Sequence, residues 1–346
     1  MLTTPTHKRM TILAATAAVA ALVLAGCSDT ATSTPPAGDP DAAPQVTFIQ
    51  KLAGTSYFTA AFQGATAAAE ELGGEVNELA PSTPTASEQI PLINSSISQG
   101  VRGIAIGGND PEALAPALKS ARDAGIHVVS YDSDVAKDAR QLFINQATPA
   151  SVSEAMVQAL ADDIGPEGGQ FAILSSNPTN TNQNTWIEAI EADIEANHPN
   201  LELAEVAYGE DATDKIQQTV RNLVQSYPDL KGIIAVTAVA LPAGAAAVED
   251  LGLSGELSIT GVATPNDMKT YVDNGTVNAF VLWDVVKLGY LAYYAVAALQ
   301  SGEITGEEGE SFTAGDAGTY TVGADGEVLL GDPVTFTADN IDEYDF

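Results

Sequence analysis

The fold is decided by residues 103–130, GIAIGGNDPEALAPALKSARDAGIHVVS, in which a helical pattern separates two short apolar runs. Both runs are nearly continuous in apolar residues, as in strands that are buried on both faces of a sheet. Between them, Asn109 or Asp110 can cap a helix N-terminus, and Pro111 suits the first helical position. We therefore expect a helix over 111–124 and a strand–helix–strand unit with parallel strands.

The same alternation continues along the chain. Further strands are expected at 46–49, 75–79, 141–145, 171–174, 203–207, 232–236, 257–262 and 277–282. Further helices are expected near 58–72, 87–98, 186–196, 213–225, 241–251, 266–274 and 285–300. The strands fall into two successive sets, which predicts an α/β fold with two doubly wound parallel-sheet lobes. Ligands bind beyond the carboxyl ends of such strands, so a cleft between the lobes is the expected site.

Composition excludes several kinds of function. The 346 residues include 46 Asp and Glu against 13 Lys and Arg, for a formal charge of −33. Such a chain is repelled by the phosphates of nucleic acid, because backbone binding depends on Lys and Arg. The chain contains a single cysteine, which excludes a disulfide framework, a cysteine-based zinc site and a CxxC redox centre.

The N-terminus predicts an exported protein. A basic group at Lys8 and Arg9 precedes an uncharged apolar run, and Leu-Ala-Gly-Cys then ends at Cys27. This ending resembles the lipobox of bacterial lipoproteins, which implies removal of residues 1–26 and lipidation of Cys27; an ordinary secretory signal is the alternative. The Pro-, Ser- and Thr-rich residues up to 44 then read as a flexible tether.

Motifs for catalysis and cofactor binding are missing. The sequence has no GxxxxGK[ST], no GxGxxG after a strand, no GxSxG and no HExxH, so we expect neither a cofactor nor a metal. His127 lies within an apolar strand and His198 near a helix end, and neither has the setting of a catalytic base. Asp132 and Asp134 lack the further ligand spacing of a calcium loop; we interpret them as polar groups that hold a ligand at a strand end.

Short motifs at the expected strand ends resemble a known family. In chain order they are QKL at 50–52, YF at 57–58, YDSD at 131–134, FINQATP at 143–149, NQNTW at 182–186, ALP at 240–242, TPNDM at 264–268 and LWDVV at 282–286. Together they resemble the periplasmic sugar-binding proteins of ABC importers, in the ribose-binding-like superfamily. Within it, the autoinducer-2-binding and rhamnose-binding branch is nearest. The resemblance implies a type I periplasmic binding protein that binds a sugar without chemistry.

The resemblance also implies ligand-binding residues. The lysine of the autoinducer-2 branch matches Lys51, its aspartate Asp132, its glutamine Gln183 and its backbone-contributing alanine Ala238. Two positions depart from that branch: Asn182 stands where the branch has aspartate, and Val236 where it has proline. The first change replaces an acceptor by an amide with donors, which favours a pentose, a deoxyhexose such as rhamnose or a related polyol over autoinducer-2.

Aromatic and polar residues near these positions complete the expected site. Sugars present hydroxyls around the rim and apolar C–H faces, which aromatic rings can cover. The candidates are Tyr57, Phe58, Trp186, Asn266, Trp283 and Asp284. Phe58 and Trp186 lie on helical stretches and are equally compatible with core positions, and Asn266 equally with a helix cap.

We expect the lobes to be discontinuous in sequence and joined by a three-segment hinge, near 145–149, 262–265 and 283–285. The prediction assigns 45–146 plus 265–282 to the N-terminal lobe and 147–264 plus 283–346 to the C-terminal lobe. Residues 301–346 are expected to form a surface excursion. The leading hypothesis is a monomeric, lipid-anchored protein that delivers a sugar to an ABC permease. Autoinducer-2 uptake, a sugar-sensing module and a secreted sugar enzyme remain as alternatives.

Overall fold

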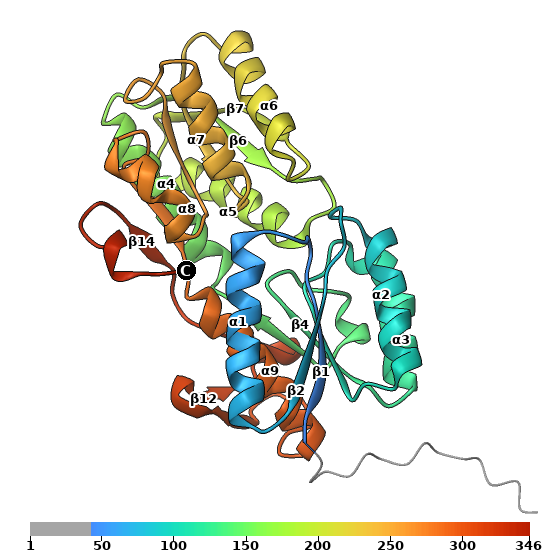
Figure 1. Cartoon of the computed structure of the whole chain (residues 1–346). Helices are drawn as coiled ribbons and strands as arrows, with labels where there is room; N and C mark the ends of the chain where they lie inside the picture. Colours follow the sequence, from blue (N-terminus) through green and yellow to red (C-terminus); the bar gives the residue numbers. More distant parts are fainter. Residues whose placement is uncertain (1–42) are drawn as a thin grey trace, which may run out of the picture. The chain divides into compact units, whose positions relative to one another are not determined.

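The computed structural model describes residues 43–346, and the predicted signal peptide, Cys27 and most of the tether lie outside the described residues. The described part contains two parallel β-sheets covered by helices, which confirms the predicted α/β class (Figure 1). None of the helices within residues 43–346 has the length and apolar character needed to cross a membrane.

The first sheet has the strand order β13-β5-β4-β3-β1-β2, and every neighbouring pair is parallel. Its strands are β1 (Gln45–Ile49), β2 (Glu75–Leu79), β3 (Gly103–Ile106), β4 (His127–Tyr131), β5 (Leu142–Asn145) and β13 (Glu327–Leu329). Its helices are α1 (Ser56–Glu71), α2 (Ala86–Gln99), α3 (Pro111–Asp123) and α9 (Val285–Ser301). Helices α2 and α3 lie on one face and α1 and α9 on the other (Figure 1).

Successive side chains of a strand point to opposite faces of the sheet, and in the central strands of the first sheet both sets are mostly apolar, so both faces are covered by helices. Ile104 and Ile106 of β3 point into the core beneath α2 and α3, whereas Ala105 points into the core beneath α1 and α9. Helix α9 approaches α1 very closely, because a Cβ atom at Gly289 would lie 1.7 Å from the Ala61 carbonyl oxygen. The nearly continuous apolar runs of the sequence are therefore strands and helices buried on more than one side.

The second sheet has the order β7-β6-β8-β9 and is also parallel. A parallel bridge between Val262 and Val281 continues it to β10, which pairs antiparallel with β14. These strands are β6 (Gly169–Ser175), β7 (Leu201–Tyr208), β8 (Leu230–Ala235), β9 (Ser258–Gly261), β10 (Phe280–Leu282) and β14 (Val334–Phe336). The helices are α4 (Pro149–Ile164), α5 (Thr181–Asn197), α6 (Thr213–Ser226), α7 (Ala240–Asp250) and α8 (Pro265–Asp273).

The predicted division into lobes is wrong in its later segments. Residues 265–282 were expected in the N-terminal lobe, but α8 packs against α7, and β10 extends the second sheet. Helix α9 was expected in the C-terminal lobe, but it packs on α1 and the first sheet. Thirteen of its residues are buried, and only a neighbouring helix and a sheet face together can cover so much apolar surface.

The C-terminal segment is not a surface excursion. Strands β11 (Ser311–Ala314) and β12 (Gly318–Thr321) form a hairpin beside α9, β13 is an edge strand of the first sheet, and β14 belongs to the second. The described chain therefore crosses between the lobes after β5, after β10 and after β13. The first two crossings lie at the hinges predicted near 145–149 and 283–285, whereas the hinge predicted near 262–265 lies within the second lobe and the third crossing follows β13 instead.

Candidate functional site

A cavity lies between the carboxyl ends of strands from both sheets. It is lined by Lys51, Leu52, Thr55, Tyr57, Phe58, Asp132, Asn182, Gln183, Trp186, Asp211, Val236, Thr237, Ala238, Val239, Val262 and Trp283. The empty space between these side chains, including the part open to solvent, is about 510 Å³. A concave, mainly apolar site with a few convergent polar groups is typical of small-molecule binding.

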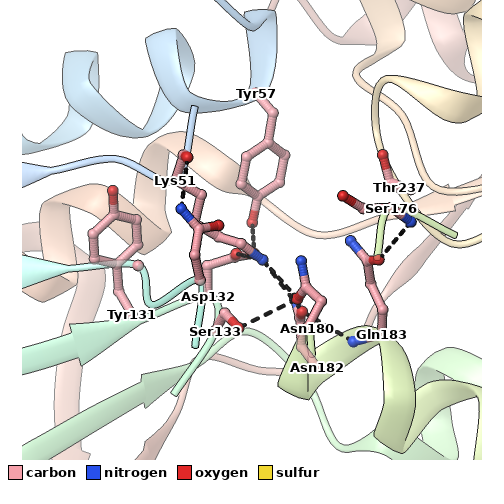
Figure 2. Close-up of polar contacts among 12 residues, drawn as sticks. Lys51, Tyr57, Tyr131, Asp132, Ser133, Ser176, Asn180, Asn182, Gln183 and Thr237 are labelled. Carbon is pink, nitrogen blue, oxygen red and sulfur yellow. Dashed lines mark hydrogen bonds and ion pairs between the residues drawn. The ribbon is translucent and has the colours of Figure 1, made fainter. Parts of the chain in front are cut away.

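Lys51 joins the two lobes. Its backbone follows β1 and is held in place by Asn109, whose Nδ2 donates to the Lys51 carbonyl at 2.9 Å. The Lys51 Nζ donates to Oδ1 of Asn180 at 2.9 Å and to Oδ1 of Asn182 at 3.4 Å, both at the start of α5 in the other lobe (Figure 2). It also lies 3.6 Å from Oδ2 of Asp132.

Asp132 is the acceptor at the centre of the site. It follows β4 in a left-handed backbone conformation, with φ of 61°, which aspartate adopts more readily than most residues. Tyr57 donates its hydroxyl to Oδ1 of Asp132 at 2.8 Å (Figure 2), and Trp283 Nε1 donates to the Tyr57 hydroxyl oxygen at 3.0 Å. This chain of hydrogen bonds fixes both aromatic side chains relative to the carboxylate.

Burial is the main cause of the shifted pKa values of Lys51, Asp132 and Tyr57. The loss of water lowers the pKa of Lys51, although the nearby carboxylates of Asp132 and Asp211 oppose that change. Burial raises the pKa of Asp132, against the opposing effect of the Lys51 ammonium. Burial and the Asp132 carboxylate raise the pKa of Tyr57 well above its usual value. Tyr57 therefore remains a neutral hydrogen-bond donor at ordinary pH.

The second lobe presents amide donors. Gln183 Oε1 accepts a hydrogen bond from the Ser176 backbone at 2.9 Å (Figure 2). It also accepts from Ser175 Oγ at 2.8 Å. Asn182 Oδ1 accepts from the Gln183 backbone at 2.9 Å and from Lys51. Because both amide oxygens are occupied, the NH₂ groups of Asn182 and Gln183 remain to donate to a ligand.

Four aromatic side chains form part of the wall. Trp186 and Trp283 have ring centroids 5.7 Å apart, and Tyr57 meets the Trp283 ring edge to face at 6.1 Å. Tyr57 and Phe58 are in edge-to-face contact at 5.0 Å. All four are less than 9% exposed, so they are packed in the structure and also border the cavity. These rings can cover the C–H faces of a sugar, as the sequence analysis expected.

The structure brings most of the predicted site residues together. Those that line the cavity are Lys51, Tyr57, Phe58, Asp132, Asn182, Gln183, Trp186, Val236, Ala238 and Trp283. The predicted ligand contacts Asp134, Asn266 and Asp284 do not line it.

Those three residues make structural contacts outside the cavity instead. Asp134 forms an ion pair with Arg140, with Nε to Oδ1 at 2.6 Å. Asn266 lies in the first turn of α8 and donates from Nδ2 to Asp345 at 3.2 Å. Asp284 caps α9 by accepting from the Lys287 backbone at 2.8 Å.

Two polar residues of the site, Asp211 and Thr237, were not predicted from the sequence. Asp211, from the loop after β7, lines the cavity and accepts a hydrogen bond from Thr237 Oγ1 at 2.5 Å. Thr237 follows β8 between the predicted contacts Val236 and Ala238. The position of Thr237 at the end of a strand could have indicated that it belongs to the site. Asp211 lies in an acidic loop without a recognisable motif, so nothing in the sequence indicated that it does. Within residues 43–346, no cluster of His, Cys, Asp and Glu could hold a metal ion.

Comparisons with known proteins agree with this geometry. The model of the periplasmic binding protein domain family matches residues 46–304. A sugar ABC transporter protein from Actinomyces odontolyticus is 42% identical, with a TM-score of 0.71 over 88% of this chain and 98% of that chain. A solute-binding protein from Clostridium phytofermentas with bound L-rhamnose is 36% identical, with a TM-score of 0.83 over 87% and 98%. LsrB from Clostridium saccharobutylicum, in complex with AI-2, is 29% identical, with a TM-score of 0.83 over 87% and 99%.

Proposed function

The chain belongs to the periplasmic binding protein family, and we propose that it captures a pentose, a deoxyhexose such as rhamnose or a related polyol for import. It is a sugar-binding protein of an ABC transporter and not an enzyme. The family is extracytoplasmic, which agrees with the exported N-terminus expected from the sequence. The class of sugar, the residues that bind it and the lipid anchor are proposals.

The arrangement of hydrogen-bond donors and acceptors in the cavity is the observation that supports the proposed class of ligand. The amide groups of Asn182 and Gln183 donate, and the carboxylates of Asp132 and Asp211 accept. A hydroxyl group can do both, so a small polyhydroxy compound can satisfy the two sets together.

The apolar wall favours a compact sugar with few exocyclic groups. Val236, Val239, Val262 and Leu52 line the same cavity as the aromatic residues. A methyl group in place of a hydroxymethyl group suits such a wall, because no hydroxyl is then buried without a partner. The relative with bound L-rhamnose supports this class of ligand.

Autoinducer-2 uptake is the second candidate. The relative LsrB is in complex with AI-2, and the lysine, aspartate and glutamine positions of that branch are Lys51, Asp132 and Gln183 here. Asn182 argues against it, because its oxygen already accepts from Lys51 and the Gln183 backbone and its free group is a donor.

A thermal-shift screen of the purified protein tests the proposal. The panel contains pentoses, deoxyhexoses, polyols and autoinducer-2. A ligand at 100 times its Kd should stabilise the fold by roughly 2.7 kcal/mol. We expect stabilisation by one sugar of the panel, and its loss in Gln183→Leu, which removes the amide donors. Stabilisation by autoinducer-2 alone would replace the first candidate by the second, and no stabilisation by any member would refute both.

We also propose that the mature protein is a monomer anchored by lipid at Cys27, where the Leu-Ala-Gly-Cys sequence supports lipidation. The tether up to residue 44 would let the binding domain reach a permease in the same membrane. Metabolic labelling with an alkyne fatty acid should mark the full-length protein. Labelling should disappear in Cys27→Ala, and equal labelling of both would refute the anchor.

A further inference from the structure

Asp211 occupies the boundary between the cavity and a hollow outside it. It lines the cavity together with Lys51 and Asp132, and it also lines a neighbouring hollow with residues of both lobes, such as Thr83 and Asn177. Leu52 is the other residue that borders both spaces. Asp211 therefore lies where the two spaces meet.

The backbone that carries Asp211 is strained. Glu210 and Asp211 have φ of 53° and 49°, a left-handed conformation that is unfavourable for most residues with a Cβ atom and costs glutamate more than aspartate. The loop is held there by hydrogen bonds from Gly209 and Glu210 to the carbonyl oxygens of Ser175 and Ser176, at 2.8 and 2.9 Å. Two consecutive strained residues at the edge of a cavity suggest a functional position.

The Asp211 carboxylate is fixed through one oxygen only. Its Oδ1 accepts from Thr237 Oγ1, and the Thr237 oxygen in turn accepts from the Val239 backbone at 3.2 Å. Among the residues that the structure describes, the second oxygen of Asp211 has no hydrogen-bond partner. That oxygen is therefore available to accept from a ligand hydroxyl.

The charges around the cavity do not balance. Of the side chains that line it, Lys51 is the single cation, and Asp132 and Asp211 are anions. Lys51 lies 3.6 Å from Asp132, and this pair is nearly neutral as seen from a distance. The Asp211 carboxylate is then the net charge that a ligand meets.

We propose that Asp211 is a specificity-determining residue that restricts the cavity to neutral polyhydroxy ligands and excludes sugars that carry a carboxylate or a phosphate. The inference rests on the proposed sugar-binding function and deepens it. A neutral sugar donates a hydroxyl to the free oxygen of Asp211. An anionic sugar meets a like charge in a partly desolvated site, where Coulomb repulsion is weakly screened.

Matched pairs of sugars test this proposal. L-rhamnose and L-mannuronate, D-fucose and D-galacturonate, and D-xylose and D-glucuronate share their ring configurations, and only the second member of each pair is charged. Calorimetry at one ionic strength gives the ratio of the two Kd values for each pair whose neutral member binds. The proteins are the wild type, Asp211→Asn and the control Asp214→Asn, which removes an exposed carboxylate outside the cavity.

We expect the wild type to bind the neutral member at least tenfold more tightly than the uronate. Asp211→Asn should reduce this ratio by roughly tenfold, and Asp214→Asn should leave it unchanged. An unchanged ratio in Asp211→Asn, or an equal change in both variants, would overturn the role of Asp211 while sugar binding stands. If the wild type binds no neutral sugar, the proposed function fails and the inference with it.

Discussion

Replacing Lys51 by methionine tests how the site is held together. The variant keeps most of the aliphatic side chain but removes the ammonium group that lies 3.6 Å from Asp132 and donates to Asn180 at 2.9 Å. The two charged side chains are 7% and 6% exposed, so the Asp132 carboxylate would be left buried without a cation. Among residues 43–346, the Tyr57 hydroxyl would be the one side-chain donor left to it.

The size of the effect follows from that burial. Removing one partner of a buried ion pair usually costs about 3–5 kcal/mol. We expect a smaller loss, about 1–3 kcal/mol of unfolding free energy, because the cavity lets water approach Asp132. Adding Asp132→Asn should recover most of this loss. Asparagine tolerates the left-handed backbone at this position, and its oxygen can still accept from Tyr57.

Urea denaturation of the wild type, both single variants and the double variant gives the coupling energy between the two positions. Tryptophan fluorescence is a direct probe, because the chain has two tryptophans and both line the cavity. We expect a coupling of at least 1 kcal/mol, and loss of sugar binding in the double variant despite its recovered stability. A Lys51→Met protein as stable as the wild type, or a second substitution that recovers nothing, would refute this account of the site.

Three further predictions use urea denaturation as well. Gly289→Ala should destabilise the protein by about 3 kcal/mol or more, because the added methyl group overlaps the backbone of α1. The control variant Gly302→Ala should cost only about 1 kcal/mol, because its methyl group meets no atom within 4 Å and the cost comes from the φ of 74° alone. Tyr57→Phe should cost about 1–3 kcal/mol, since the Trp283 N–H loses its acceptor, and an unchanged stability would contradict the hydrogen-bond chain. Burial lowers the pKa of His127, so below pH 6.5 the unfolded state binds more protons and stability should rise with pH. His127→Gln should reduce the slope of unfolding free energy against pH between pH 5 and 7. An identical slope in the variant would show that His127 does not cause this pH dependence.

The sequence was sufficient for the fold class because the relevant signal is local. Many strands are short apolar runs and several helices begin at a recognisable cap, as at Asp110, whose side chain accepts from the Ala113 backbone at 3.1 Å. The division into lobes depends instead on long-range pairing. Nothing near Glu327–Leu329 indicates that this strand pairs with β5, and nothing near Phe280–Leu282 indicates that it extends the second sheet.

The site residues were predictable where their position depends on local sequence, and they were missed where it depends on contacts between distant segments. Lys51 and Asp132 could be predicted because they lie at the carboxyl ends of parallel strands, which end at one edge of their sheet, whereas Ala238 was implied only by the family resemblance. Asp134 was misplaced because a single residue, Ser133, separates it from Asp132, and its ion pair with Arg140 is not visible in the sequence pattern. Asp211 was missed because its role depends on contact with Thr237 from another strand.

Recognition and lobe contact use the same atoms in this protein. Lys51, which borders the cavity, also donates across the lobes to Asn180 and Asn182. The amide groups of Asn182 and Gln183 keep this geometry because their oxygens are already occupied. A ligand without acceptors at the right positions leaves those NH₂ groups unpaired once the lobes enclose it, at a cost of about 1–3 kcal/mol for each buried group. A mismatched sugar should therefore still enter the open cleft, and its selection should take place when the lobes close around it.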